Sequence, residues 1–279
     1  MTFRTRFAPS PTGPLHLGHA YSAMLAHDMA RAAHGIFLLR MDDLDQARSR
    51  PEWAAQIEDD LTWLGLAWPH PVLRQSLRST RYRSALETLW ARGLLFACSC
   101  TRADIRAAAA APQEGAALHG PDGLIYPGTC RPKAPASGPL PDAVLRLDMA
   151  RAAQDIAFTE TGVAPARTIH ITAETLIREV GDVVLARRDM GASYHLGVVL
   201  DDADQQITHV IRGEDLFAAT QIHVVLQKLL HLPTPTYHHH KLIRDENGKR
   251  LAKRDDARAL ATYRAEGKSP QDIRALLGS

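Results

Sequence analysis

Short apolar runs alternate with helix-like stretches over the first hundred residues. The run IFLLRMDD at 36–43 is apolar almost without a break until its two closing acids, which is typical of a strand buried in a parallel sheet. Residues 81–93 instead repeat apolar side chains every three or four positions, as one face of a helix does. The same patterns predict, in order, a strand at 5–10, a helix at 17–35, a strand at 36–43, and helices at 51–66 and 81–93. Strands that alternate with helices predict an α/β protein with a doubly wound parallel sheet, whose ligands lie beyond the carboxyl ends of the strands.

The pattern changes after residue 97. Residues 112–141 are rich in proline and glycine, which predicts mostly loop. We therefore expect residues 98–190 to form an inserted α+β subdomain that divides the sheet-bearing domain into two halves, 1–97 and 191–279. The remaining predicted elements are strands at 143–148, 182–189, 193–202, 206–213 and 236–243, and helices at 215–231, 257–267 and 269–279.

Composition and charge exclude several classes of protein. The 33 basic and 31 acidic residues give a net charge of +2, so the chain has no overall basic bias toward nucleic acid and only a local patch could bind RNA. The N-terminal segment lacks the apolar core of a signal peptide, and no apolar run is long enough for a membrane span. Three cysteines, two of them in CSC, do not indicate a disulfide framework. We expect a soluble cytoplasmic protein that binds no membrane.

The segment RFAPSPTGPLHLGHA at 6–20 joins the first predicted strand to the first helix. A tight loop at this place in an α/β sheet binds phosphates, because backbone N–H groups and the helix dipole point into the crevice. Gly13 and Gly18 permit a close approach of the ligand, and His16 and His19 lie one helical turn apart, so that both can face the same target. Taken alone, HLGH favours a plainer interpretation, a capped helix start with two surface histidines.

A second segment far along the chain changes this interpretation. KRLAKRDD at 249–256 follows an Asn-Gly turn and carries four cations before two acids, which by itself is typical of a solvated basic turn. Together the two segments resemble the paired signatures of class I aminoacyl-tRNA synthetases, in which HLGH is similar to the HIGH element and RLAKR to the KMSKS element. RFAPSPTGPLHLGHA, LLRMDDLDQARSRPE, HVIRGEDL and RLAKRDDA are all similar to the glutamyl branch of that class, in collinear order over nearly the whole chain.

The resemblance implies a ligase of the aminoacyl-tRNA synthetase type. Residues 1–97 and 191–279 are then the two halves of a Rossmann-like catalytic domain of the class I synthetases, and 98–190 is a zinc-bearing subdomain inserted between them. Too few residues follow Lys253 for an anticodon-binding domain, so we expect none. We also expect a monomer.

The family's first reaction joins an amino-acid carboxylate to the α-phosphate of ATP, with release of pyrophosphate. Positioning and electrostatic stabilisation of the phosphate charge do most of this work. The resemblance implies that His16, His19 and Lys253 are catalytic, and that ATP is bound by His16, Gly18, His19, Arg250, Leu251 and Lys253. Mg²⁺ is expected to accompany the ATP. Ala252 stands where the family's loop has a serine, which removes one hydroxyl donor to the phosphates.

The resemblance also implies that the amino acid is glutamate. Arginine pairs a carboxylate with bidentate geometry, and Arg6 and Arg212 match the family's substrate arginines. The expected glutamate-binding residues are Arg6, Phe7, Ala8, Pro9, Ser10, Asp42, Tyr194 and Arg212. Asp42 is a departure, because the family has a longer glutamate where the substrate amino group binds. The residues alone leave open that Tyr194 is an ordinary strand aromatic and that Arg212 belongs to a structural ion pair.

Three cysteines, Cys98, Cys100 and Cys130, form a candidate metal site. A structural zinc takes four ligands in a tetrahedron, and the cysteines cluster around a loop-rich stretch with few apolar residues. Chemistry alone leaves open inert buried cysteines, or His119 as the fourth ligand. The resemblance instead implies Tyr126, because CSCTR and YPGTCR are similar to the zinc site of a short paralogue of the glutamyl synthetases. We therefore expect one structural Zn²⁺ bound by Cys98, Cys100, Tyr126 and Cys130.

The short paralogue also implies an acceptor for the glutamate. After activation that needs no tRNA, glutamate is transferred to the queuosine base at the wobble position, in the anticodon stem-loop of tRNA(Asp). Anticodon loops suit this because their bases splay out and stack on protein side chains. Basic side chains that could follow the phosphates are Arg131, Lys133, Arg187, Arg188 and Arg258. Two alternatives stay open: a fragmentary glutamyl-tRNA synthetase that charges tRNA(Glu), and a catalytically silent paralogue that only binds RNA.

Overall fold

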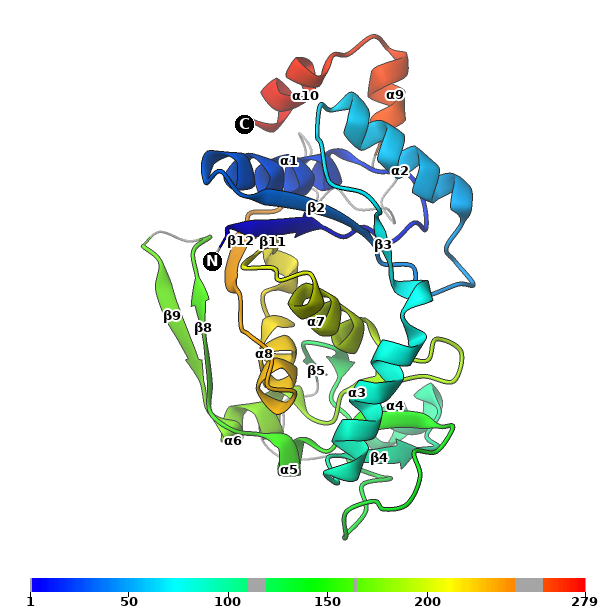
Figure 1. The fold of residues 1–279 in the computed structure, drawn as a ribbon. Coiled ribbons are helices and arrows are strands. Elements are labelled where there is room, and N and C mark those ends of the chain that lie inside the picture. The colour runs from blue at the N-terminus through cyan, green and yellow to red at the C-terminus, as the bar shows by residue number, and fades with distance from the viewer. Residues whose placement is uncertain (1, 110–118, 163–164, 244–257, 279) are drawn as a thin grey trace.

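A parallel sheet built from both ends of the chain forms the centre of the fold (Figure 1). The computed structural model describes residues 2–109, 119–162, 165–243 and 258–278. The strands that pair in parallel are β1 (Arg4–Phe7), β2 (Ile36–Met41) and β3 (Leu73–Arg74), and likewise β11 (His209–Gly213) and β12 (Thr236–His240). The two groups meet where the N–H of Thr208 donates to the carbonyl of Arg4 at 3.0 Å. The parallel α/β sheet expected from the sequence is therefore confirmed.

Helices cover both faces of this sheet (Figure 1). One face carries α1 (Leu17–Ala32), α2 (Pro51–Trp63), α9 (Leu260–Ala265) and α10 (Pro270–Leu277), and the other carries α7 (Tyr194–Asp204) and α8 (Thr220–Leu229). Alternation along β2 builds the two cores, because Phe37 and Leu39 pack with α1 and α2 while Leu38 packs against the core around α7 and α8. β8 (Ile156–Glu160) extends the sheet beyond β12, and β9 (Arg167–Ile171) returns antiparallel to it.

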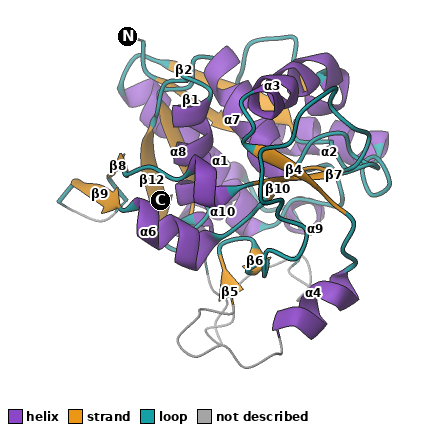
Figure 2. Ribbon diagram, turned by 90° about the horizontal axis from the view of Figure 1, so that it is seen from below, coloured by secondary structure: helices purple, strands orange, loops and turns teal. Residues whose placement is uncertain are grey.

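A smaller antiparallel sheet lies at the far end of α3 from the parallel sheet (Figure 1). Its strands are β4 (Leu95–Cys98), β7 (Val144–Leu147) and β10 (Val184–Ala186), in the order β10-β7-β4. The neighbouring elements are α3 (Ser79–Ala91), α4 (Arg102–Ala109), β5 (His119–Gly120), β6 (Gly123–Leu124), α5 (Met149–Ala152), α6 (Ala173–Thr175) and the π-helical turn Leu176–Val180. Figure 2 shows α4, β5 and β6 at the edge of the molecule, next to this sheet. The boundaries of the inserted subdomain, 98–190, stay a prediction.

The sequence prediction is wrong at residues 193–202, which form most of helix α7 and not a strand. The Ser193 hydroxyl caps the helix by accepting a hydrogen bond from the N–H of Leu196 at 3.4 Å. All eight residues from His195 to Asp202 are buried. A helix buried on every side has no polar face, so its sequence lacks the helical period and reads like a buried strand.

Other boundaries shift by a few residues. The predicted helix 215–231 begins with the 3₁₀ turn Glu214–Leu216 and continues as α8 only from Thr220. The last helix follows the prediction closely, because Ser269 caps α10 and Pro270 occupies its first turn. None of the helices within the described ranges combines the length and the hydropathy needed to cross a bilayer.

Asp60 on α2 is a buried carboxylate with an expected effect on stability. It is 1% exposed, and its Oδ2 has no hydrogen-bond partner among the described residues. Burial, together with the nearby charge of Asp59, raises the pKa of Asp60 from 3.8 to about 6. The folded state therefore binds this proton more tightly than the unfolded state does, so stability decreases as the pH rises from about 4 to above 6.

We expect Asp60→Asn to remove this pH dependence. A shift of about two pKa units corresponds to roughly 3 kcal/mol, so the variant should be more stable than wild type at about pH 8 by up to that amount, and nearly equal to it at about pH 4. Urea unfolding at the two pH values measures the difference. Glu87→Gln, an exposed carboxylate on α3 that pairs with Arg83, is the control and should change little. Equal stabilities of Asp60→Asn and wild type at high pH would contradict the prediction.

Candidate active site

A cavity of about 570 Å³ opens at the carboxyl ends of β1 and β11, beside the start of α1. All of the glutamate-binding residues predicted from the sequence line it, together with the predicted nucleotide-binding residues of the first loop: Arg6, Phe7, Ala8, Pro9, Ser10, His16, Gly18, His19, Asp42, Tyr194 and Arg212. The sequence did not single out the other lining residues, which include Ser22, Asp215, Leu216 and His240. Arg250, Leu251 and Lys253 lie outside the described residues.

His16 and His19 both cap helix α1 and line the cavity. His16 Nδ1 accepts from the N–H of Gly18 at 3.1 Å, and His19 Nδ1 accepts from the N–H of His16 at 3.2 Å. The two rings stack with their centroids 3.7 Å apart. Because each Nδ1 accepts a hydrogen bond, a neutral ring carries its proton on Nε2. The cap therefore fixes the tautomer in which both histidines carry an N–H donor on Nε2. The capped helix start that HLGH alone favoured is confirmed, but His16 is buried and is not a surface histidine, and its contact with a phosphate stays a prediction.

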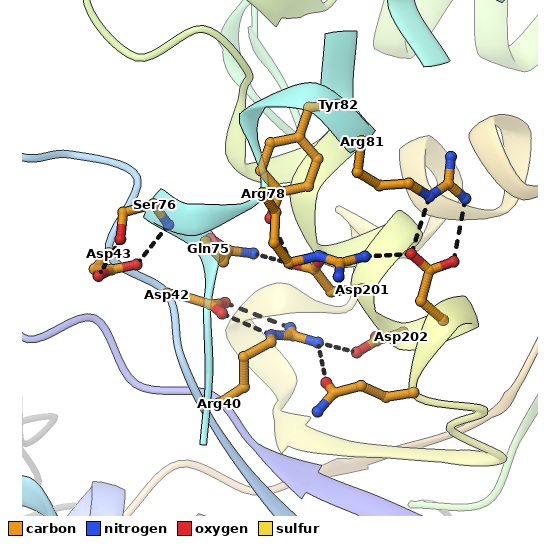
Figure 3. Close-up of polar contacts among 12 residues, drawn as sticks. Arg40, Asp42, Asp43, Gln75, Ser76, Arg78, Arg81, Tyr82, Asp201 and Asp202 are labelled. Carbon is orange, nitrogen blue, oxygen red and sulfur yellow. Dashed lines mark hydrogen bonds and ion pairs between the residues drawn. The ribbon is translucent and has the colours of Figure 1, made fainter. Parts of the chain in front are cut away.

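Asp202 pairs with two of the arginines near the cavity. Arg6 donates to both carboxylate oxygens of Asp202, at 3.0 Å and 3.2 Å. Arg40 donates to the same carboxylate at 2.6 Å (Figure 3). All three side chains are buried. Burial alone would raise the pKa of Asp202, but the two guanidinium groups outweigh it and lower that pKa below its ordinary value. Arg6 is thus already paired within the protein.

Asp42 lines the cavity and is bound by Arg40, whose Nε donates to Asp42 Oδ1 at 2.7 Å (Figure 3). Burial raises the pKa of Asp42 from 3.8 to about 6, although the charge of Arg40 opposes this shift. A carboxylate in a cavity of this kind can pair with a ligand ammonium group. It does so only above about pH 6, when it is ionised.

This pKa predicts a pH dependence of amino-acid binding. Protonation of Asp42 removes the charge that would pair the ammonium group, so we expect the KM for the amino acid to rise as the pH falls through about 6. Steady-state kinetics between about pH 5 and pH 8 measure this, with the KM for ATP as the control. Asp42→Asn should have a raised KM at all pH values and a flatter profile. A wild-type KM that does not change over this range would contradict the assignment.

Helix α7 is anchored by a second buried carboxylate, Asp201. Asp201 accepts hydrogen bonds from Gln75 Nε2 at 2.8 Å, from the Tyr82 hydroxyl at 2.8 Å and from Arg78 Nε at 2.7 Å (Figure 3). Nearby, Asp43 accepts from both the N–H and the hydroxyl of Ser76, each at 2.8 Å. These contacts fix α7 against α3 and the segment after β2. They hold Tyr194, the first residue of α7, at the cavity, and Asp202 against Arg6, which lines it.

The Arg212 guanidinium, at the end of β11, has different surroundings from Arg6 and Arg40. Its Nε donates to His239 Nε2 at 3.1 Å, and one Nη1 hydrogen is directed to His223 Nδ1 at 3.2 Å. Its Nη2 donates to the Thr220 hydroxyl at 2.8 Å and to the Leu216 carbonyl at 3.2 Å. Within the described ranges, none of these partners is a carboxylate. The structural ion pair that the sequence left open for Arg212 is therefore not what holds it.

The three cysteines and Tyr126 lie together near β4. The three Sγ atoms are all within 4.8 Å of one another, and Cys100 and Cys130 are 3.4 Å apart. The Tyr126 hydroxyl lies 3.5 Å from Cys98 Sγ and 3.3 Å from Cys100 Sγ, and it accepts from the N–H of Cys130 at 2.7 Å. His119, the alternative fourth ligand, lies exposed on β5 and does not belong to this cluster. Of the residues described, the structure thus favours Tyr126 over His119.

A second cavity, of about 710 Å³, lies beside the cysteine cluster and is strongly basic. Its cationic lining residues are Arg102, Arg106, Arg146, Arg187 and Arg188. Of the residues expected to follow RNA phosphates, Arg187 and Arg188 thus lie in this cavity. Arg131 pairs instead with Asp182 and Arg258 with Glu266.

The chain is similar in sequence to a known protein family and to named members of it. The family described as tRNA synthetases class I (E and Q), catalytic domain, matches residues 2–278. The chain therefore belongs to the class I tRNA synthetases. Within that class it is 66% identical, over 98% of its length and 99% of the relative's, to the glutamyl-Q tRNA(Asp) synthetase of Rhodobacter capsulatus. It is 42% identical to the protein of the same name from Symbiobacterium thermophilum, over 96% of this chain and 83% of that one.

A solved structure shares the fold. The glutamate tRNA ligase of Elizabethkingia meningosepticum, crystallised in complex with its amino acid, superposes with a TM-score of 0.74 at 27% sequence identity. The match covers 97% of this chain and 59% of the ligase. The class I synthetase fold expected from the sequence is therefore confirmed, while the chain spans less than two thirds of the length of that ligase.

Proposed function

We propose that the protein activates L-glutamate with ATP, without tRNA, and transfers the glutamate to the queuosine base at the wobble position of tRNA(Asp). Glutamate activation is supported by Arg212, a buried cation whose partners among the described residues are neutral. It lines the same cavity as His16 and His19. Such a cavity suits a ligand with a side-chain carboxylate at one end and a phosphate at the other. The second half rests on the names of the relatives at 66% and 42% identity.

In the proposed first step, an oxygen of the α-carboxylate of glutamate attacks the α-phosphorus of ATP. The bond from that phosphorus to the pyrophosphate oxygen breaks, and pyrophosphate leaves. His16 and His19 donate from Nε2 to the phosphate oxygens, where negative charge develops. Arg212 pairs the side-chain carboxylate of glutamate, and Asp42 pairs its ammonium group. Lys253 is assigned to the pyrophosphate by its place in RLAKR alone. Mg²⁺ enters with the ATP phosphates.

In the second step, a hydroxyl of the queuosine cyclopentene-diol attacks the glutamyl carbonyl carbon and AMP leaves. The basic cavity with Arg187 and Arg188 suits the phosphates of an anticodon stem-loop. We also propose that the protein acts as a monomer in the cytoplasm.

We also propose that the cluster of Cys98, Cys100, Tyr126 and Cys130 holds one structural Zn²⁺. Zinc–sulfur bonds of about 2.3 Å and a zinc–oxygen bond of about 2.1 Å give a tetrahedron with S–S edges near 3.8 Å and S–O edges near 3.6 Å. The distances of 3.3 Å to 3.5 Å among these atoms lie close to such edges. A closed site of this kind would stabilise the surrounding loops and take no part in the reaction.

Metal analysis tests this proposal directly. Protein purified without a chelator should contain about one zinc per chain, and Cys100→Ser should bind it more weakly and unfold at a lower temperature. His119→Ala, which leaves the cluster intact, should keep the metal. Wild-type protein that contains no zinc, or loss of zinc in His119→Ala but not in a Tyr126→Phe variant, would contradict the assigned ligands.

ATP–pyrophosphate exchange tests the activation step. The protein should catalyse exchange with glutamate in the absence of tRNA, and it should exchange far more slowly with glutamine, whose neutral amide leaves Arg212 unpaired. Aspartate is the control for the length of the side chain. Absence of exchange with glutamate in a folded protein would overturn the proposed function and favour a silent paralogue.

A further inference from the structure

The charges around the buried arginines at and near the cavity are distributed unevenly. Arg6 and Arg40 are bonded to the carboxylates of Asp202 and Asp42. Arg212 is equally buried, but its side-chain partners are two imidazoles and a hydroxyl. A buried guanidinium normally pairs with a carboxylate, because an isolated charge in the interior is costly. The neutral surroundings of Arg212 therefore need a functional explanation.

Hydrogen bonds set the protonation of the histidines around Arg212. A guanidinium only donates, so His239 Nε2 and His223 Nδ1 must both accept. The proton of His239 then lies on Nδ1, which donates to Glu160 at 2.5 Å. The proton of His223 lies on Nε2, which donates to His195 Nδ1 at 3.1 Å. Both histidines are consequently neutral whenever Arg212 is in place.

The environment supports the same protonation. Burial lowers the pKa of His239 to about 4, and the charge of Arg212 adds to this effect. Burial lowers the pKa of His223 well below its ordinary value for the same two reasons. His239 is also held firmly in place through Glu160. Glu160 accepts from the N–H groups of Gly162 and His239, and a side chain at Gly162 would lie 2.0 Å from the carbonyl oxygen of His239.

The hydrogen bonds of Arg212 determine which of its N–H groups can bind a ligand. The four bonds of Arg212 use four of its five N–H groups, and the fifth is on Nη1. Glu160, the carboxylate bonded to His239, is separated from Arg212 by the His239 ring. Arg212 is therefore held on three sides while its charge stays without a directly bonded counter-ion.

We propose that His223 and Thr220 are positioning residues that determine the selectivity of the cavity for a carboxylate: as neutral acceptors they orient Arg212 without neutralising it. This inference rests on the proposed function, since the carboxylate is the side chain of glutamate. It assigns the selection to Arg212 and not to Arg6, whose charge Asp202 already balances. A carboxylate at position 223 would orient the guanidinium equally well but would occupy its charge.

Three substitutions of His223 separate orientation from charge. In His223→Asn, the side-chain oxygen takes the place of Nδ1 as a neutral acceptor, so the KM for glutamate should stay within about threefold of wild type. In His223→Leu, no acceptor remains, and the KM should rise about 10- to 100-fold, the equivalent of one hydrogen bond to a charged group. In His223→Asp, the acceptor remains but carries a charge, and the KM should rise at least as much as in His223→Leu.

Exchange kinetics with glutamate and ATP measure all three variants, and kcat and the KM for ATP should change by less than about threefold. Thr220→Val and Thr220→Ser form a second pair that changes the side chain very little, and only the valine variant should raise the KM for glutamate. His27→Leu removes a buried histidine on α1 outside the cavity and is the control for a general packing defect.

Each outcome decides a different claim. A KM near the wild-type value in both His223→Leu and Thr220→Val would show that these residues only fill the core, and it would overturn the inference. Equal KM values in His223→Asp and His223→Asn would refute the requirement for neutral partners. No exchange with glutamate by the wild-type protein would instead overturn the proposed function itself.

Discussion

Arg212→Leu should raise the KM for glutamate in ATP–pyrophosphate exchange by roughly 100- to 1,000-fold, the equivalent of about 3–4 kcal/mol. The substitution removes a buried cation of the cavity whose partners among the described residues are neutral, so a bound carboxylate would lose its counter-charge. The KM for ATP should change little, because the phosphate donors belong to α1. Arg212→Lys keeps the charge but lacks the planar fork that reaches all four acceptors of Arg212, so an intermediate loss is expected.

Arg6→Leu is the informative comparison. It leaves Asp202 with Arg40 as its remaining partner, so it should lower the unfolding temperature as well as the activity. Arg212→Leu should affect glutamate binding more than stability. An unchanged KM for glutamate in folded Arg212→Leu would contradict the role of Arg212.

His19→Asn should lower kcat for exchange by about 100- to 1,000-fold, the loss typical of one donor to a developing phosphate charge. The asparagine oxygen takes the place of Nδ1 and can still accept from the N–H of His16, so the cap of α1 is retained. What the substitution removes is the Nε2 donor. The unfolding temperature should therefore stay close to that of wild type.

His16→Ala is the matched comparison, because it removes both the cap and the donor. It should lower kcat to a similar degree and also destabilise the protein by about 1 kcal/mol. Nearly normal exchange by folded His19→Asn would show that the histidines only cap the helix, which is the plainer interpretation of HLGH.

The sequence predicted the parts of the site that lie in local motifs. The loop 6–20 combines prolines and glycines with two histidines one turn apart, and together with the distant RLAKR segment these features predicted a phosphate site at the start of α1, where the structure has a cavity. The apolar run at 36–43 likewise predicted a buried parallel strand, which the structure shows as β2. The strand prediction depends only on neighbours within a few residues of one another, whereas the phosphate site also needed the second motif and the family resemblance.

The residues that pair with the arginines of the cavity could not be predicted from local patterns. Asp202 acts on Arg6 from 196 positions away in the chain, and His223 reaches Arg212 from a different element. The only local signal was the acidic pair at 201–202, and it was misread as the end of a strand because the helix that carries it is buried on all sides. Long-range partners of this kind depend on how α7 and α8 pack, which no short pattern reports.

The cysteine site lies between these cases. Cys98 and Cys100 are close in the sequence, and their clustering with Cys130 around a loop-rich stretch predicted a metal site, although the cysteines alone left inert buried residues open. Chemistry alone left His119 and Tyr126 open as the fourth ligand, and the resemblance predicted Tyr126. The fold supports that choice, because the Tyr126 hydroxyl lies within 3.5 Å of the Cys98 and Cys100 sulfur atoms.

Transfer of glutamate to queuosine can be measured in a single labelling assay. Labelled glutamate, ATP and the protein are incubated with tRNA(Asp) that carries queuosine, with tRNA(Asp) that lacks it, and with tRNA(Glu). We expect label only on the queuosine-bearing tRNA(Asp), and the same amount after its 3′-terminal adenosine has been removed. Label on the 3′ end of tRNA(Glu), or on tRNA(Asp) without queuosine, would contradict the account.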